Sequence, residues 1–182
     1  MTEGFKVIVV DPPWRYNHRA NDVTHRARNQ YPDMSLDEIK ALPIRKLAHS
    51  DCVLWLWTTN GFMFDAIEIL DAWGFRREEI LTWVKDRMGL GDLLRSRTEH
   101  CLLGIKGEPA KPVNPPSTLL EAPMRRHSRK PDEFYSVVDA VCGFPFQSSG
   151  TSSSLLRTSG EHHDERATDD SFGAIRGSRG RS

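Results

Sequence analysis

The sequence lacks several features that would each assign it to a particular class of protein. It has only three cysteines, Cys52, Cys101 and Cys142, in 182 residues, and their wide spacing fits no zinc motif. This pattern favours reduced cysteines in or near the core of a cytoplasmic protein. No apolar run comes near the roughly 20 residues that cross a bilayer, and residues 1–6 lack the layout of a signal peptide. We therefore expect neither a metal site nor a membrane partner.

The sequence also has no net charge. The 25 basic and 25 acidic residues cancel, so no overall field attracts the chain to nucleic acid or to an anionic surface. Any binding of a polyanion must then come from local basic patches. The length itself fits one domain.

Short apolar runs recur along the first two thirds of the chain. Runs of this kind, rich in β-branched residues and bounded by turn residues, are typical of buried strands. Two prolines follow the first run, so the chain must leave the sheet there. The predicted strands cover residues 5–10, 52–59, 80–84 and 101–105.

Helix signals lie between and after these strands. Residues 35–38 form a capping-box pattern, and Asn60 is placed to cap a helix with apolar residues at helical spacing. A last helix opens at Lys130, with Pro131 at its first helical position, and Gly143 ends it. Strands alternating with helices predict an α/β fold in which helices cover the faces of a sheet.

Residues 144–182 differ in composition from everything before them. They contain no lysine, many serines, and few apolar residues without any period. Such a segment cannot bury enough apolar surface to offset the entropy lost on ordering. We therefore divide the chain into a folded domain over residues 1–143 and a disordered tail over residues 144–182.

The strongest chemical signal is Asp11-Pro12-Pro13-Trp14, directly after the first predicted strand. Ligands of open α/β sheets bind beyond the carboxyl ends of strands. The exocyclic amine of adenine is a poor nucleophile, because its lone pair is delocalised into the ring. The Asp11 carboxylate and the Pro12 carbonyl, whose direction the two prolines fix, can take its two hydrogens and align it with a methyl sulfonium. Trp14 offers a flat face for an extruded base.

The same four residues can also form an ordinary turn after a strand, with Trp14 in the core. The strand before them and a polar loop after them, which carries Arg15, Arg19, Arg26 and Arg28, favour the catalytic interpretation. Catalysis at such a site rests on alignment and electrostatics rather than on a strong base.

Further motifs follow this one in a recognisable order. They are YPDMSLDEI (31–39), VLWLWTTN (53–60), AWGF (72–75), WVKD (83–86), EHCLLGIKGEP (99–109) and HSRKPDEFY (127–135). Over residues 5 to about 142 the chain thus resembles the family of the catalytic subunit of the eukaryotic mRNA N6-adenosine methyltransferase, which also contains small bacterial and phage DNA adenine methyltransferases. The resemblance implies a Rossmann-like fold with a permuted motif order and S-adenosylmethionine as the cofactor.

The resemblance also implies roles that spacing does not give. Asp11 and Pro12 would hold the target amine beside the cofactor, with Pro13 completing the motif, and Trp14 would stack on the base or shape its pocket. Lys130 would contact polar groups of the cofactor. Tyr31 and Asn60 would line the adenine pocket. The basic cluster of Arg125, Arg126, Arg129 and Lys130 either contacts phosphates or belongs to a solvated loop.

The resemblance stops after the last predicted helix. Relatives continue with a strand similar to R-x-L-E-L-F-x-R and a W-x-x-W-G-N-like end, which hold the ribose and adenine of the cofactor. Residues 144–182 contain no equivalent strand, either through a frameshift near codon 143, which we favour, or through natural divergence. The strand over residues 5–10 would then be an edge with unpaired backbone groups, and we expect weak or no cofactor binding and a tendency to aggregate.

The function that follows is methyl transfer to the N6 amine of adenine in nucleic acid. DNA is preferred, because the chain is short and lacks the accessory regions of the eukaryotic RNA enzymes. N4-cytosine methylation is a rival within the same class. The main alternative is a catalytically impaired or non-catalytic chain that binds nucleic acid, alone, as a homodimer or with an active partner subunit. A purely structural α/β domain is a third possibility.

Overall fold

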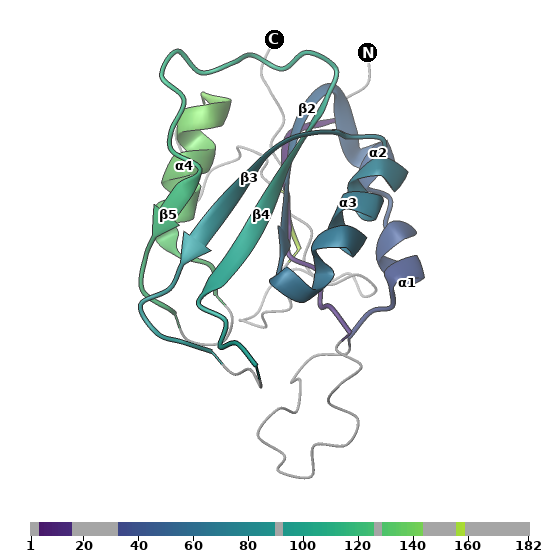
Figure 1. The fold of residues 1–182 in the computed structure, drawn as a ribbon. Coiled ribbons are helices and arrows are strands. Elements are labelled where there is room, and N and C mark those ends of the chain that lie inside the picture. The colour runs from purple at the N-terminus through teal and green to yellow at the C-terminus, as the bar shows by residue number, and fades with distance from the viewer. Residues whose placement is uncertain (1–3, 16–32, 90–92, 126–128, 144–155, 159–182) are drawn as a thin grey trace, which may run out of the picture.

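The computed structural model describes residues 4–15, 33–89, 93–125, 129–143 and the backbone of 156–158. A mixed sheet of six strands forms the centre of this part, in the order β5-β3-β4-β2-β1-β6 (Figure 1). The three central pairings join β1 in parallel to β2, β2 in antiparallel to β4, and β4 in antiparallel to β3. The bounds of these strands are Phe5–Val10 for β1, Ala48–Thr58 for β2, Arg76–Val84 for β3 and Thr98–Lys106 for β4.

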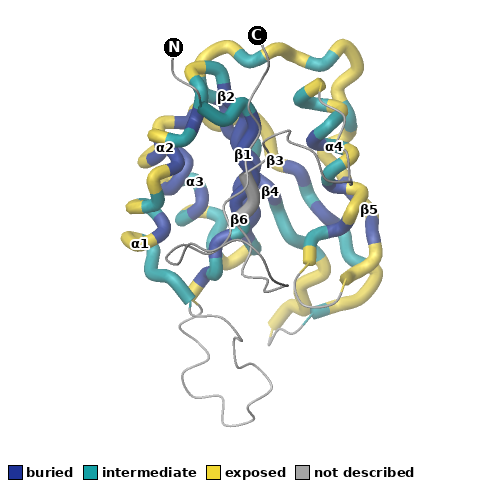
Figure 2. Tube along the Cα trace, turned by 180° about the vertical axis from the view of Figure 1, so that it is seen from behind, coloured by how far each residue is buried: buried dark blue, intermediate teal, exposed yellow. Residues whose placement is uncertain are grey.

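Helices cover both faces of the sheet, as the alternating pattern predicts. The short helices α1 and α2 and the longer α3 lie on one face, while α4 lies on the other (Figures 1 and 2). A 3₁₀ turn, η2, leads into α3. Their bounds are Leu36–Lys40 for α1, Ile44–Leu47 for α2, Asn60–Phe62 for η2, Met63–Ala72 for α3 and Asp132–Cys142 for α4.

The period of two along a strand divides the apolar residues between two cores. Leu54 and Leu56 of β2 face α1–α3 and belong to one buried cluster. Trp55 and Trp57 face the other way and pack with Phe134 of α4. Successive side chains of a strand point to opposite faces, so a continuous apolar run is what a strand covered on both sides requires.

Several local predictions are confirmed and two need correction. Ser35 caps α1 through a complete capping box with Glu38. Asn60 does not cap a helix but lies inside η2. Pro131 precedes α4 as its N-cap rather than opening it as the first helical residue. Gly143 ends α4 with φ of 69°, a left-handed conformation that favours glycine.

The cysteines are also as predicted. All three are free thiols, and Cys52 and Cys101 are buried. Among the helices that the structure describes, none has the length and apolar character needed to cross a bilayer.

The outer edge of β1 corrects the prediction that this edge is unpaired. Residues Leu156–Thr158 form β6, which pairs in parallel with Ile8 to Val10 of β1. β1 is therefore paired on both sides over these residues and is not an edge strand. At the opposite end of the sheet, the edge position is held by β5 (Leu119–Glu121), which pairs in parallel with β3.

Removing residues 144–182 should therefore destabilise the sheet. The truncated chain would expose the backbone groups of Ile8, Val9 and Val10 that β6 pairs in the full chain, and an unpaired edge promotes association between chains. We expect faster amide hydrogen exchange in β1 than in the full chain, with β3 and β4 less affected, together with increased light scattering. Equal exchange rates in β1 of both chains would show that β6 contributes nothing.

Candidate active site

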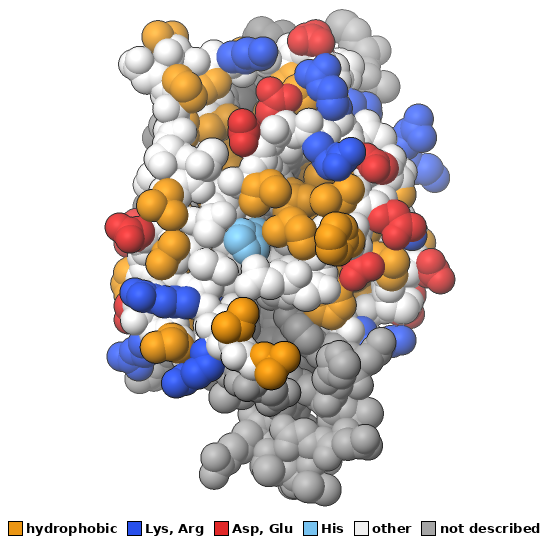
Figure 3. All heavy atoms as spheres, in the orientation of Figure 1, with side chains coloured by type: hydrophobic (Ala, Val, Ile, Leu, Met, Phe, Trp, Pro, Cys, Tyr) orange, Lys and Arg blue, Asp and Glu red, His pale blue; other side chains and the backbone are white. Residues whose placement is uncertain are grey.

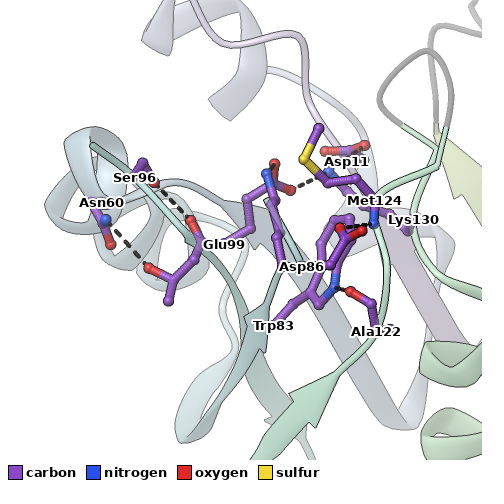
Figure 4. A network of polar contacts seen from close by, with 11 residues as sticks. Asp11, Asn60, Trp83, Asp86, Ser96, Glu99, Ala122, Met124 and Lys130 are labelled. Carbon is purple, nitrogen blue, oxygen red and sulfur yellow. Dashed lines mark hydrogen bonds and ion pairs between the residues drawn. The ribbon is translucent and has the colours of Figure 1, made fainter. Parts of the chain in front are cut away.

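Four charged side chains from distant parts of the sequence meet at one end of the sheet. Asp11 follows β1, and its neighbour β2 runs in parallel and ends at the same edge. The antiparallel β4 begins at this edge and carries Glu99 as its second residue, and β3 ends there just before Lys85. Lys130 reaches the same point from the segment before α4 (Figure 4).

These four residues form what we call the charge chain. The Lys130 Nζ lies 3.1 Å from Asp11 Oδ2 and 2.9 Å from Glu99 Oε2. The second oxygen of Glu99 pairs with Lys85. Positive and negative groups thus alternate, and the exposed fractions of the four side chains lie between 12% and 23%. At such burial an ion pair is only weakly screened, so each charge depends on its neighbours.

The environment keeps the inner members of the charge chain ionised. Burial alone would lower the pKa of Lys130, but the carboxylates of Asp11 and Glu99 outweigh this effect and raise it. Burial alone would raise the pKa of Glu99, but Lys130 and Lys85 outweigh this effect and lower it. Both groups are therefore charged at neutral pH.

Aromatic rings lie beneath the two lysines. The Lys130 Nζ is 4.8 Å from the centroid of Trp57, and the Lys85 Nζ is 4.9 Å from that of Trp83. The two indoles meet edge to face, with centroids 6.1 Å apart. A cation over an aromatic face gains about 0.5–2 kcal/mol, more as water is excluded. The rings thus favour the position in which Lys130 bridges Asp11 and Glu99.

The backbone of the Asp-Pro-Pro-Trp motif is fixed by its own hydrogen bonds. The Trp14 amide donates to the Pro12 carbonyl at 2.9 Å, and the Met34 amide donates to the Pro13 carbonyl at 2.9 Å. A carbonyl oxygen can accept two hydrogen bonds, so the Pro12 oxygen keeps capacity for a second donor. The turn predicted from the two prolines is thus a rigid support for Asp11.

Trp14 lies in the core rather than in an open pocket. Only 7% of the residue is exposed, its ring stacks on Phe62 with centroids 5.0 Å apart, and its indole N–H donates to the Trp57 carbonyl at 3.2 Å. A base would need an open ring face to stack upon. The structure therefore places Trp14 in the core, as the alternative interpretation of the motif expected, and shows no open face on which a base could stack.

Asn60 belongs to a neighbouring polar network. Its Oδ1 lies 2.6 Å from His100 Nε2, and its Nδ2 donates to Thr98 Oγ1 at 3.5 Å. The other ring nitrogen of His100 lies 3.1 Å from Thr82 Oγ1. Asn60 thus ties η2 to β4 beside the predicted site. Tyr31, the other residue predicted to line the adenine pocket, lies outside the described residues.

The members of the predicted basic cluster have different partners in the structure. Arg125 and Arg129 both pair with Asp132, at 3.2 and 2.7 Å, and remain 38% and 57% exposed. Lys130 points away from them, into the charge chain. Two guanidinium groups thus share one carboxylate at the start of α4. Arg126 lies outside the described residues.

Glu99 and Lys85 are site residues to which we assigned no role from the sequence. Both stand in motifs quoted for the resemblance, WVKD and EHCLLGIKGEP. Glu99 precedes the buried Cys101 by two residues, and Lys85 follows the buried Trp83 by two. Because residues i and i+2 share a face of a strand, this spacing could have placed both beside the core packed against α4.

The segment that carries β5 is tied to the same end of the sheet. The Met124 amide donates to Asp86 Oδ1 at 2.8 Å, and the Trp83 indole donates to the Ala122 carbonyl at 2.8 Å (Figure 4). These bonds hold the segment after β5 against the end of β3, near Lys85 and Lys130. The charge chain therefore has support on the side of β3 as well as on that of β1.

Comparison with known proteins identifies the family of the chain. The family model described as MT-A70 matches residues 5–151. The chain belongs to the MT-A70 family. Its fold is accordingly the Rossmann-like methyltransferase fold, and methyltransferases of this family use S-adenosylmethionine as methyl donor.

Individual relatives agree with this assignment. The chain is 34% identical to the N(6)-adenosine-methyltransferase MT-A70-like of Arabidopsis thaliana and 32% identical to the N(6)-adenosine-methyltransferase catalytic subunit METTL3 of Homo sapiens, over 75% of its own length but only 20% and 23% of theirs. It is 28% identical to the Type II methyltransferase M.MunI of Mycoplasma sp, over 75% of its length and 66% of that protein's. The chain therefore spans about a fifth of the plant and human relatives.

The described residues of this candidate site fit the polar part of S-adenosylmethionine. The methionine moiety of this cofactor carries an ammonium group, a carboxylate and a sulfonium. Asp11 and Glu99 supply carboxylates that favour the two positive groups, and Lys130 supplies a donor for the negative one. The motif Asp11–Trp14 lies beyond the carboxyl end of a sheet strand, where ligands of such folds bind.

Replacing Glu99 with Gln should change the dependence of stability on pH. The folded-state pKa of Glu99 is lowered from its ordinary value of 4.5, so its stabilisation is complete above that value and is lost as pH falls through the lowered one. We expect Glu99→Gln to lose about 2–3 kcal/mol of unfolding free energy at pH 7, since both lysines lose a partner. The difference from the original chain should shrink by pH 3, as measured by urea unfolding.

The exposed pair of Lys40 and Glu68 supplies the control. The Glu68 side chain is 59% exposed, so Glu68→Gln should change stability by less than about 1 kcal/mol at either pH. Equal losses for Glu99→Gln at pH 7 and pH 3 would mean that ionisation of Glu99 does not stabilise the fold.

Proposed function

We propose that this chain transfers a methyl group from S-adenosylmethionine to the N6 amine of adenine in nucleic acid, with DNA as the preferred substrate. The observation that carries the proposal is the Asp11 carboxylate, held by Lys130 at 3.1 Å beyond the carboxyl end of β1 in a member of the MT-A70 family.

The proposed chemistry depends on holding a weak nucleophile. The amine of adenine must turn its lone pair toward the methyl group, which requires acceptors for both of its hydrogens. The Asp11 carboxylate and the Pro12 carbonyl are adjacent acceptors on a fixed backbone. Because the proton is lost readily once the amine is methylated, alignment rather than a strong base lowers the barrier.

The charge chain positions Asp11 for this task. Lys130 holds Oδ2 from one side, and a carboxylate can accept from further donors. Glu99 in turn pairs with Lys130, so the two carboxylates share the Lys130 ammonium. The cofactor, when bound, supplies the electrophilic methyl group and its positive charge, which the two carboxylates favour electrostatically.

The preference for DNA rests on the similarity to the Type II methyltransferase M.MunI, to which the chain is 28% identical. It is an argument from analogy, and the substrate is therefore part of the test. The exposed guanidinium groups of Arg125 and Arg129 supply local contacts for phosphates in either polymer.

Methyl transfer from labelled S-adenosylmethionine to adenine-containing DNA and RNA tests the proposal. We expect incorporation into DNA, with Asp11→Asn reducing the rate at least about a hundredfold, because a neutral amide aligns the amine poorly. Asp71→Asn, at the exposed end of α3, should retain full activity.

The other outcomes are equally informative. Incorporation into RNA alone would overturn the preference for DNA. Inactivity on both polymers, with salt-dependent nucleic-acid binding retained, would instead support the non-catalytic alternative. Activity that survives in Asp11→Asn would remove Asp11 from the mechanism.

Lys130 should matter for cofactor binding. We expect Lys130→Met to weaken binding of S-adenosylmethionine about tenfold or more, because a charge-assisted contact is lost and two carboxylates are left to repel each other. Lys130→Arg keeps the charge and should lose less. Isothermal titration calorimetry on both folded variants measures the effect, and unchanged affinity in Lys130→Met would show that Lys130 does not contact the cofactor.

A further inference from the structure

A cavity of about 280 Å³ lies on the α4 face of the sheet, away from the charge chain. It is bounded by the sheet, by α4 and by the connection between β4 and β5, and no residue of the charge chain lines it. Leu103, the lining residue of β4 nearest to Glu99, is four positions away from it along the strand. At about 3.3 Å per residue these two positions are roughly 13 Å apart.

The inner surface of the cavity is apolar. Side chains from three strands form its floor, and two valines of α4 form one side. A small-molecule site is typically a mostly apolar hollow with a few polar groups, of about 300–1,000 Å³, so this cavity suits a compact ligand. The apolar lining residues are Val53, Trp55, Leu81, Leu103, Ile105, Val137 and Val141.

The opposite wall is stiff and fixed at both ends. It contains Pro109, Pro112, Pro115 and Pro116, which restrict the backbone. At its start, the Glu108 amide donates to Asp51 Oδ1 at 2.9 Å. At its end, the Thr118 carbonyl accepts from the Thr82 amide at 2.8 Å. A wall of this kind keeps the cavity open without a ligand, which lowers the entropic cost of binding.

Gly107 fixes the direction in which this wall leaves β4. Its φ is +67°, and a Cβ at this position would lie 2.2 Å from the Ser50 carbonyl oxygen. The connection therefore starts along a path that other residues cannot adopt without displacing β2. The cavity is thus formed by specific backbone contacts and not by a loose loop.

The charged side chains that line the cavity are mainly acidic. Glu78, Glu79 and Glu108 are exposed carboxylates, and Lys111 is the one basic group among the lining residues. Within the part of the chain that the structure describes, none of these carboxylates forms an ion pair. Acidic side chains lie next to apolar ones in the upper part of the face seen in Figure 3. An apolar interior with a negative rim favours a ligand that has an apolar body and a positive end.

We propose that this cavity binds a compact amphipathic cation, with its apolar body between α4 and the sheet and its ammonium group among Glu78, Glu79 and Glu108. The site is separate from the proposed methyl-transfer site, so it does not depend on that function. The wall of prolines limits the length of the ligand, and the carboxylates select its charge.

Three probes that differ only in their end group test the charge selection. Phenethylamine, phenethyl alcohol and phenylacetate carry the same phenyl ring with a positive, neutral or negative end. We expect calorimetric titration of the full chain to give the tightest binding for phenethylamine, about fivefold tighter than the alcohol, which corresponds to one or two screened charge contacts. In the triple variant Glu78→Gln, Glu79→Gln, Glu108→Gln this preference should fall to near unity.

Filling the cavity tests its location. Val137 is half-buried on α4 and lines the cavity, so Val137→Phe should abolish binding of all three probes, and Val141→Phe should do the same from the next turn. Ser136→Phe adds the same ring at an exposed position of the same helix and should leave binding unchanged. Circular dichroism and thermal melting identify variants that still fold.

Several results would overturn the proposal. They are no binding of any probe to the unmodified chain, equal affinity for all three probes, or retained binding in a folded Val137→Phe variant. Loss of methyl transfer in Asp11→Asn with unchanged phenethylamine binding would show that the two sites are independent, as proposed.

Discussion

The bridge that Lys130 makes between Asp11 and Glu99 holds the functional end of this fold together. It joins three segments that the sequence places far apart, namely the end of β1, the start of β4 and the approach to α4. Two carboxylates at this burial would repel each other without the ammonium between them, and the ammonium would be costly to bury without the carboxylates. Each charge is tolerated only because the other two are present.

The two faces of the sheet hold the site in different ways. On the α1–α3 side, Trp14 stacks on Phe62 and anchors the acceptor motif in an apolar core. On the α4 side, Trp57 and Trp83 support the lysines and exclude water beneath them. The acceptor carboxylate therefore stands between a packed core that fixes its backbone and a set of charges that fixes its side chain.

Much of this architecture follows from patterns in the sequence, but the site is only partly predictable. Apolar runs located β1 to β4, and Ser35 and Gly143 marked helix ends where the structure has them. The role of Glu99 depends on the register of β3, β4 and β2, which is a property of pairing across the sheet. β6 was missed because three residues in a polar segment carry no periodic signal, and only their pairing with β1 makes them a strand.

The pairing of β1 with β6 also has a consequence for synthesis on the ribosome. β1 emerges from the ribosome about 150 residues before Leu156–Thr158. At about 5–20 residues per second, the side of β1 that receives β6 stays open for roughly 7–30 s. During that time an unpaired strand edge is available to other nascent chains. The edge of β1, the strand that carries the acceptor motif, is therefore most exposed during translation, before the strand that pairs with it, about 150 residues later in the chain, has been synthesised.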